Sequence, residues 1–257
     1  MSRDQGTLAY DDSFARAYDD IFSDMAENAA PVDFLAACFE GVEVLLELGV
    51  GTGRIALPLA GRGYRIIGVD DSGAMLERLH AKDATGAGVD ARQADMADLD
   101  PQIRAGGVYS VLGSLSCLLD SEARRRVFAQ AAGAVPAGAR FVLEVYNPAV
   151  IRSMHAGRRD PVSVDLDYPG RGTLTSRYTL SADGSVWSAD HRWQARSEVT
   201  TFHEALALVD PLDIVAEADP WWRPVALLRD WSGAPLDAEQ GALLVVVLER
   251  NSEEGAS

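Results

Sequence analysis

An apolar run that ends in three alternating glycines constrains the fold of this chain more than any other stretch. Residues 44–60 read VLLELGVGTGRIALPLA, with glycines at Gly49, Gly51 and Gly53. The run before the glycines has the composition of a buried strand, and the segment after them has a helical pattern. Alternating glycines let the backbone approach a ligand closely, and free N–H groups at a helix start favour an anion. The stretch therefore predicts a strand, a turn that holds a nucleotide-type ligand, and a helix.

Short apolar runs alternate with helical patterns between about residues 42 and 146. The predicted strands are 42–48, 64–70, 89–95, 108–113 and 140–146. The predicted helices lie near 53–61, 73–82 and 121–134. Repeated strand–helix units imply right-handed crossovers and a parallel sheet with both faces buried. Pro58 falls inside the first of these helices, where it would remove a hydrogen bond and bend the helix.

Residues 160–210 show a different pattern, because polar and apolar residues alternate there with a period of two. This pattern predicts an antiparallel meander that is inserted as a lid after the fifth strand. A short helix near 211–219 follows, and strands at 223–231 and 242–250 return to the main sheet. We therefore predict an α/β fold with four parts: an N-terminal helical lid (1–40), a Rossmann-like cofactor-binding core (41–150), a β-rich substrate lid (151–210) and C-terminal core strands (211–257).

Charge and cysteine content narrow the class of partners. The formal net charge is -16, and Lys82 is the only lysine. Because tracking phosphates requires clustered Lys and Arg, nucleic acid and anionic membranes are not expected as partners. The two cysteines, Cys38 and Cys117, form no CxxC pair, which argues against a metal cluster. A reduced, cytoplasmic setting is expected, since the N-terminus is polar and no apolar stretch reaches membrane-spanning length.

The residues around the glycines indicate which ligand the turn would hold. A dinucleotide fingerprint reads G-x-G-x-x-G, whereas here the sixth position is Arg54 and the pattern is E-x-G-x-G-x-G. A carboxylate at Glu47 would repel a pyrophosphate and would attract an ammonium group. The pattern therefore favours a ligand that carries an amino acid.

On these residues the sequence resembles the class I S-adenosylmethionine-dependent methyltransferases over roughly residues 10–250. It is similar in particular to the bacterial small-molecule branch, which acts on sugars, amines and natural products. ELGVGTGRIALPLA resembles the first motif of this family, GVDDSGAML the second, RQADMADL the third, and VLGSLSCL the segment of the fourth strand. The resemblance implies a Rossmann-like fold with a mainly parallel seven-stranded sheet and S-adenosylmethionine as the cofactor.

The resemblance also implies roles for individual residues. Glu47 and the glycines would line the methionine part of the cofactor, Asp70 would take the ribose hydroxyls, and Asp95 would accept from the adenine amino group. The full set of expected cofactor-binding residues is Tyr18, Glu47, Gly49, Gly51, Gly53, Arg54, Asp70, Asp71, Met75, Asp95, Met96 and Gly113.

Catalytic and substrate-binding residues are expected on the inserted lid and at the end of the fifth strand. A hydroxyl or ammonium nucleophile must lose a proton, which a His, Asp, Glu or Tyr can accept. Alternation along VWSADHRW puts His191 and Trp193 on one face, and His191 is the first candidate for the base, ahead of His155 and His203. Tyr146 ends the fifth strand. The expected catalytic residues are His191 and Tyr146, and the expected substrate contacts are Tyr18, Tyr146, His191 and Trp193.

The predicted function is transfer of a methyl group from S-adenosylmethionine to a small molecule, with O- or N-methylation expected and without a metal. Relatives are often dimers, so a homodimer is the expected assembly. Three alternatives stay open at this point. The bound sulfonium could serve a cyclisation without transfer, the chain could be a nicotinamide-dependent oxidoreductase, or it could be a non-catalytic cofactor-binding module.

Overall fold

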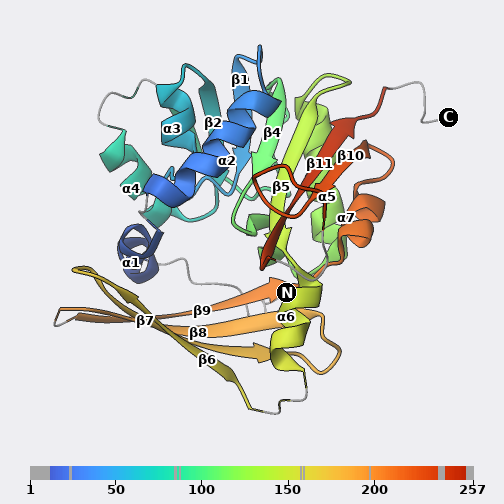
Figure 1. The fold of residues 1–257 in the computed structure, drawn as a ribbon. Coiled ribbons are helices and arrows are strands. Elements are labelled where there is room, and N and C mark those ends of the chain that lie inside the picture. The colour runs from blue at the N-terminus through green and yellow to red at the C-terminus, as the bar shows by residue number, and fades with distance from the viewer. Residues whose placement is uncertain are drawn as a thin grey trace, which may run out of the picture.

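The computed structural model of this chain describes residues 12–22, 25–83, 86, 88–156, 158, 160–196, 198–236 and 241–252, and two β-sheets organise them (Figure 1). The larger sheet has the spatial order β10-β11-β5-β4-β1-β2-β3. Its strands are β1 (Val44–Leu48), β2 (Arg65–Asp70), β3 (Val89–Gln93), β4 (Gly107–Ser110), β5 (Arg140–Tyr146), β10 (Trp222–Leu228) and β11 (Leu243–Arg250). Neighbouring strands from β3 to β5 pair in parallel, whereas β11 runs antiparallel to both β5 and β10. The predicted mainly parallel α/β sheet is thereby confirmed.

Helices lie on both faces of this sheet and at its carboxyl edge. They are α1 (Asp12–Phe22), α2 (Met25–Cys38), α3 (Ala56–Gly61), α4 (Gly73–Lys82), α5 (Ser121–Ala134), α6 (Pro148–His155) and α7 (Pro211–Ala218), with a 3-10 turn η1 (Ser114–Cys117). Figure 1 shows α2 and α3 on one face and α5 and α7 on the other. None of the described helices is both long and apolar enough to cross a bilayer.

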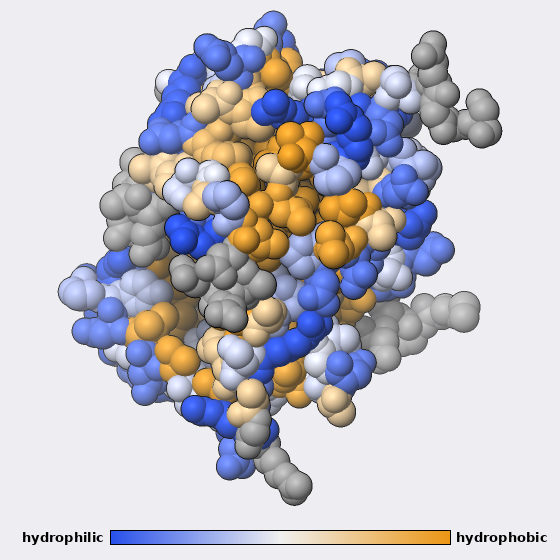
Figure 2. All heavy atoms as spheres, turned by 45° about the vertical axis from the view of Figure 1, so that its right-hand side comes forward, coloured by the Kyte–Doolittle hydropathy of each residue, from blue (hydrophilic) through white to orange (hydrophobic). Residues whose placement is uncertain are grey.

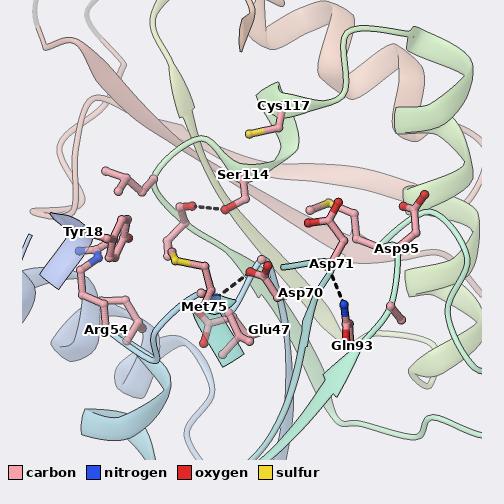
Figure 3. A pocket seen from close by; sticks show the side chains of 18 of the residues that line it. Tyr18, Glu47, Arg54, Asp70, Asp71, Met75, Gln93, Asp95, Ser114 and Cys117 are labelled. Carbon is pink, nitrogen blue, oxygen red and sulfur yellow. Dashed lines mark hydrogen bonds between the residues drawn. The ribbon is translucent and has the colours of Figure 1, made fainter. Parts of the chain in front are cut away.

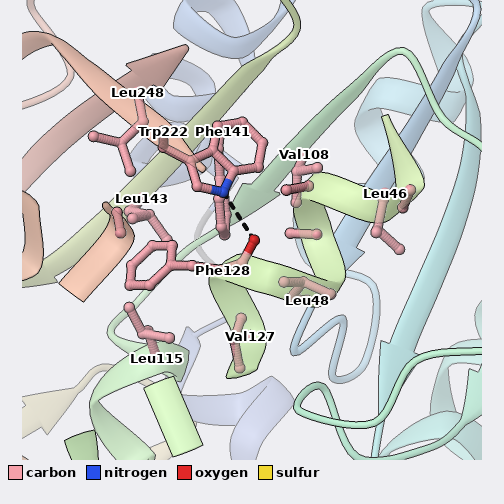
Figure 4. Close-up of a cluster of buried hydrophobic side chains, with 14 of the residues drawn as sticks. Leu46, Leu48, Val108, Leu115, Val127, Phe128, Phe141, Leu143, Trp222 and Leu248 are labelled. Carbon is pink, nitrogen blue, oxygen red and sulfur yellow. Dashed lines mark hydrogen bonds between the residues drawn. The ribbon is translucent and has the colours of Figure 1, made fainter. Parts of the chain in front are cut away.

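Two apolar clusters, one on each face of the main sheet, form the core. Successive residues of β1 alternate between them: Leu46 and Leu48 belong to the cluster with α5 and α7, and Leu45 belongs to the cluster with α2 and α3. Trp222 is 2% exposed in the first cluster, and its indole N–H donates to the Phe128 carbonyl at 2.9 Å (Figure 4). The strands are buried on both faces, as expected for parallel strands between helices.

The second sheet has four antiparallel strands in the order β6-β7-β8-β9. They are β6 (Val162–Tyr168), β7 (Gly172–Leu180), β8 (Val186–Ala195) and β9 (Glu198–Ala207). This confirms the inserted meander. Figure 1 shows it lying across the carboxyl edge of the main sheet, with α1 between it and α4. Strand β9 contacts both α1 and η1, so the insertion covers this edge.

The edge strand β10 carries features that discourage pairing with another chain. Pro224 lies within it, and the register with β11 shifts between Pro224 and Ala226. Both features interrupt a continuous row of backbone donors.

On the side of Figure 1 that carries β10 and α7, a group of apolar side chains lies within a rim of hydrophilic ones (Figure 2). Val225 of β10 is 44% exposed.

Two local expectations differ from the structure. The first predicted helix begins at Ala56 rather than near Gly53, so Pro58 falls in its first turn. Hydrogen bonds from Leu57 N–H to the Gly53 carbonyl and from Leu59 N–H to the Ile55 carbonyl flank Pro58, so the missing N–H of Pro58 does remove one bond of this turn, as expected. The expected bend stays a prediction. The helix α6 and the turn η1 were not predicted. The division of the chain into four parts stays a prediction, and residues 1–11 of the proposed helical lid lie outside the described residues.

Candidate functional site

A cavity of about 710 Å³ lies at the carboxyl ends of β1 to β4 (Figure 3). The strand order reverses between β1 and β4, which is where open α/β sheets bind ligands. Its volume is within the range of small-molecule sites. The lining residues include ten of the predicted ones: Tyr18, Glu47, Gly49, Gly51, Arg54, Asp70, Asp71, Met75, Asp95 and Met96.

The glycine turn forms the floor of the cavity. Gly49, Gly51 and Gly53 all have positive φ, at 79°, 53° and 81°. A Cβ atom on Gly49 would lie 2.5 Å from the Ser114 hydroxyl oxygen. The N–H groups of Gly49 and Val50 both donate to the Val69 carbonyl, which folds the turn over the end of β2. The turn therefore requires glycine for its conformation and, at Gly49, for close approach to η1.

Asp70 ties the second strand to this turn. Its Oδ2 accepts from the Gly51 N–H at 2.8 Å, and its Oδ1 accepts from the Ser72 N–H at 3.0 Å. Burial raises the pKa of Asp70, although these two hydrogen bonds oppose the shift. The carboxylate is thus held in one orientation at the cavity wall, with lone pairs left for hydroxyl donors.

Glu47 is a buried carboxylate with a neutral partner. It is 1% exposed, and its Oε2 accepts from the Tyr109 hydroxyl at 2.8 Å. Burial raises the pKa of Glu47 to about 8, while the Tyr109 hydrogen bond and the Arg54 charge oppose the shift. A buried acid of this kind is stabilised in its ionised form by a cation that binds beside it.

Arg54 and Tyr18 form a corner of the cavity next to Glu47. Arg54 Nη1 donates to the Asn28 side chain at 2.7 Å, but the buried Arg54 Nε has no hydrogen-bond partner among the described residues. Burial raises the pKa of Tyr18, and the nearby Arg54 guanidinium lowers it. An unpaired buried donor costs free energy, so this corner favours an acceptor such as a carboxylate.

Acidic and apolar groups line the opposite end of the cavity, away from Tyr18 and Arg54 in Figure 3. Asp95 accepts from the Ala97 N–H at 2.8 Å, and the Gln93 side chain donates to the Asp71 carbonyl at 3.1 Å. Ala94 and Met96, on either side of Asp95 in the sequence, also line the cavity. This end offers carboxylate acceptors beside an apolar surface.

Five of the predicted site residues do not line this cavity. Gly53 packs against α3 and α4, since a Cβ there would lie 3.0 Å from Leu57. Gly113 begins η1 at φ 70° beneath the Tyr146 ring. Trp193 is 2% exposed and packs with Ala17 and Ile21 of α1. The roles assigned to these residues stay predictions.

The two predicted catalytic residues, Tyr146 and His191, are among the five that do not line the cavity. Tyr146 packs with Cys117, which lines the cavity, and with Trp187 of β8. His191 has hydrogen bonds at both ring nitrogens, to Ser176 at 2.8 Å and to Glu204 at 3.1 Å. A base role for His191 would require exchange of one of these partners.

The two other histidines that were considered as bases, His155 and His203, lie elsewhere. His155 accepts from the Trp187 indole at 3.1 Å, and burial lowers its pKa. His203 pairs with Asp190 on the outer face of the second sheet, where both side chains are exposed.

Sequence reasoning missed the part of the wall that follows β4. Ser114, Cys117 and Leu118 line the cavity from η1, together with Val111 and Leu112. Their place directly after the fourth strand was a usable signal, because all carboxyl strand ends meet at one edge. Gln93 and Ala94, directly before Asp95, could have been found in the same way.

The donors and acceptors of the cavity fit an aminoacyl nucleoside. One end combines a buried carboxylate, Glu47, with an unpaired arginine donor, and so matches an ammonium and a carboxylate. The other end presents Asp70, Asp71 and Asp95, which match hydroxyl and amino donors. The carboxylates of Asp70, Asp71 and Asp95 around one cavity would repel a diphosphate. S-adenosylmethionine has all of the matching groups, whereas a nicotinamide dinucleotide lacks the ammonium and the carboxylate of an amino acid.

Comparison with known proteins agrees with this geometry. Residues 45–138 match the family described as "Methyltransferase domain". No curated protein sequence matches the chain at a significant level.

Solved structures that resemble the chain share its fold over nearly the whole length. The CcbJ methyltransferase of Streptomyces caelestis is 24% identical, with a TM-score of 0.80 over 95% of this chain and 100% of that one. CalS10 of Micromonospora echinaspora, an S-adenosylmethionine-bound amino pentose methyltransferase of calicheamicin biosynthesis, is 19% identical, with a TM-score of 0.67 over 94% and 98%. The sugar N-methyltransferase KedS8 of Streptoalloteichus is 22% identical, with a TM-score of 0.63 over 98% and 99%.

The domain match covers the strands and turn that build the cavity, and the fold around it has the seven-stranded order with a reversed last strand. Residues 45–138 therefore form a methyltransferase domain, in a chain that has the fold of solved S-adenosylmethionine-dependent methyltransferases.

Proposed function

We propose that this enzyme methylates a nitrogen or oxygen of a small molecule of secondary metabolism. The observation that carries the proposal is the buried Glu47 beside the unpaired Arg54 donor, in a cavity at the edge of the main sheet that the inserted sheet covers. CalS10 and KedS8, which act on sugars, support a small polar substrate and a nitrogen acceptor. A cytoplasmic location of the protein is consistent with its free cysteines. The homodimer stays a prediction.

Five polar side chains would hold the cofactor. Glu47 would accept from its ammonium group, while Arg54 and Tyr18 would donate to its carboxylate. Asp70 would accept from the ribose hydroxyls, because its side chain is already fixed by the glycine turn. Asp95 would accept from the adenine amino group.

The remaining predicted residues would shape the site. Met75 and Met96 would cover the faces of the adenine, and Asp71 would lie near the ribose. Gly49 and Gly51 would leave room for the aminoacyl chain, since no side chain projects from them.

When bound, S-adenosylmethionine supplies an electrophilic methyl group on its sulfonium. The chain contributes alignment and exclusion of water, because α1 and β9 cover the open edge of the main sheet. The ring of Phe14 in α1 contacts the ring of Phe202 in β9, with 4.4 Å between centroids, so these two elements pack against each other. In this proposal Tyr146 and His191 would face the substrate.

The test is incubation of the purified protein with S-adenosylmethionine and a panel of amines and alcohols, followed by mass spectrometry. S-adenosylhomocysteine should form in equal amount with a methylated product. Asp70→Ala should give neither product, whereas Asp190→Asn, on the outer face of the second sheet, should retain both. S-adenosylhomocysteine without a methylated product would contradict methyl transfer to these substrates.

A further inference from the structure

A buried chain of hydrogen bonds crosses three strands of the inserted sheet. Ser176 of β7 contacts His191 Nδ1 at 2.8 Å, and His191 Nε2 contacts Glu204 Oε1 of β9 at 3.1 Å. Ser176 is 1% exposed, and the side chains of His191 and Glu204 are 6% and 17% exposed. The register places Ser176 opposite His191, and it places Glu204 opposite Ala189, two residues along β8 from His191. All three side chains therefore share the inner face of the sheet.

Hydrogen-bond chemistry sets the direction of this chain. An ionised carboxylate can only accept, so His191 Nε2 carries the proton and donates to Glu204. In the neutral ring, Nδ1 then accepts from the Ser176 hydroxyl. Within the described part of the chain, His191 is the hydrogen-bond partner recorded for the Glu204 carboxylate, through Oε1. The other oxygen, Oε2, is left for a ligand.

Aromatic rings lie on the same face of the sheet as this carboxylate. Four of them lie on the same inner face or next to it: Tyr146, Tyr178, Trp187 and Phe202. Trp187 stacks on Tyr178 with 4.5 Å between centroids and meets Tyr146 at 5.4 Å. On the other side, the His191 ring stacks on Phe202 at 4.6 Å. An anion among aromatic faces is an environment that attracts a cation.

The aromatic wall continues into the cofactor cavity. Cys117 lines the cavity and packs with Tyr146 and Trp187, and its side chain points toward the cavity in Figure 3. Strand β9, which carries Glu204, lies against the turn η1 that ends at Cys117. After burial itself, the Glu204 charge contributes most to raising the pKa of Tyr146, followed by the acidic groups of Cys117, Tyr178 and Glu144. The contact of β9 with η1 and the packing of Tyr146 on Trp187 of β8 therefore bring Glu204 and Tyr146 to the same region, next to the part of the cavity wall that Cys117 forms.

We propose that Glu204 binds the ammonium group of an amine substrate beside the cofactor cavity, and that His191 and Ser176 are positioning residues that hold its carboxylate. This inference rests on the proposed function and narrows its substrate to amines. A charge-assisted hydrogen bond to Glu204, with aromatic faces around it, stabilises an ammonium more than a hydroxyl. His191 acts through Glu204 and does not itself contact the substrate.

The same carboxylate accounts for the proton that the substrate must lose. The ammonium N–H bond breaks and an O–H bond forms at Glu204 Oε2, while the electron pair stays on nitrogen. The nitrogen then carries the lone pair that methylation requires. The hydrogen bond from His191 keeps Oε1 occupied, so the proton goes to the oxygen that faces the substrate.

The test measures binding rather than turnover, with benzylamine and benzyl alcohol as probes of matched shape. The protein is saturated with S-adenosylhomocysteine, and probe affinity is followed by saturation-transfer NMR. We expect the wild type to bind benzylamine roughly tenfold more tightly than benzyl alcohol, as one charge-assisted hydrogen bond permits. Glu204→Gln should abolish this preference. The control Asp190→Asn removes a carboxylate–histidine pair on the outer face of the same sheet, and this variant should retain the preference for benzylamine.

The positioning role has its own readout. His191→Ala should lower the amine preference because the carboxylate is no longer held, and His191→Gln, which restores an N–H donor, should recover most of it. Equal affinity for the two probes in the wild type, an absence of benzylamine binding, or an unchanged preference in Glu204→Gln would overturn the inference. Binding of S-adenosylhomocysteine to each variant is measured separately by calorimetry. The affinities of the two probes are also measured in the absence of S-adenosylhomocysteine. Loss of cofactor-product binding would count against the proposed function, whereas loss of the amine preference alone would count only against Glu204.

Discussion

Binding of S-adenosylmethionine should release a proton below pH 8 and take one up above it. Burial raises the pKa of Glu47 to about 8 in the cofactor-free protein, so below that pH the carboxyl group is mostly protonated. Pairing with the cofactor ammonium favours the ionised carboxylate, and the proton must then leave. The same shift makes the cofactor-free protein lose stability as pH rises from 4.5, the ordinary pKa of Glu, through about 8.

The magnitude follows from two pKa values. At pH 6.5 a group with a pKa of about 8 is about 97% protonated, and a free α-amino group with a pKa of roughly 7.8 is about 5% deprotonated, so net release is about 0.9 proton. At pH 9 Glu47 is already ionised, whereas the cofactor amine must gain a proton, and net uptake is about 0.85 proton. The affinity should therefore pass through a maximum near pH 8.

Titration calorimetry in buffers of different ionisation enthalpy measures this exchange, since the slope of the observed enthalpy gives the number of protons. Tyr109→Phe removes a hydrogen bond that favours ionised Glu47 and should move the affinity maximum to higher pH. Glu47→Gln should bind more weakly and release no proton at pH 6.5. A slope of zero at both pH values in the wild type would refute the reasoning.

Three further predictions follow from the site and the core. Asp70→Ala should abolish S-adenosylmethionine binding in calorimetry, because Asp70 orders the turn and faces the cavity; unchanged affinity would refute the ribose assignment. Gly49→Ala should lower both Tm and cofactor affinity, since its Cβ would lie 2.5 Å from Ser114. The control, Gly138→Ala, has φ 80° and nothing within 4 Å of the added Cβ, so it should lower the free energy of unfolding by only about 1–2 kcal/mol. Equal losses of stability in the two variants would contradict this. Trp222→Ala should lower the free energy of unfolding in urea by about 3–5 kcal/mol, and a loss below about 1 kcal/mol would show that the core closes around the gap.

The part of the site that follows strands could be predicted from the sequence. Glu47 lies at the end of β1, and Asp70 and Asp95 lie at or just beyond the ends of β2 and β3, so a parallel sheet brings all three to one edge. The alternation that placed His191 and Trp193 on one face of a strand is also confirmed by the register. These inferences needed only strand periodicity and chain direction.

The remaining features depend on contacts between distant segments. The Glu204–His191 hydrogen bond requires the register of β8 on β9, which no local pattern sets. Trp193 has the expected face, but docking of α1 covers it. Cys117 reaches the cavity through a 3-10 turn whose shape depends on packing of Gly113 under Tyr146. Such placements arise from tertiary packing and could not be predicted from the local sequence.

The most direct test of the account is titration of the purified protein with S-adenosylmethionine and, separately, with NADH. The acidic cavity around Glu47 predicts saturable one-to-one binding of S-adenosylmethionine and no measurable binding of NADH. Tight binding of NADH, or an absence of affinity for both S-adenosylmethionine and S-adenosylhomocysteine, would contradict it.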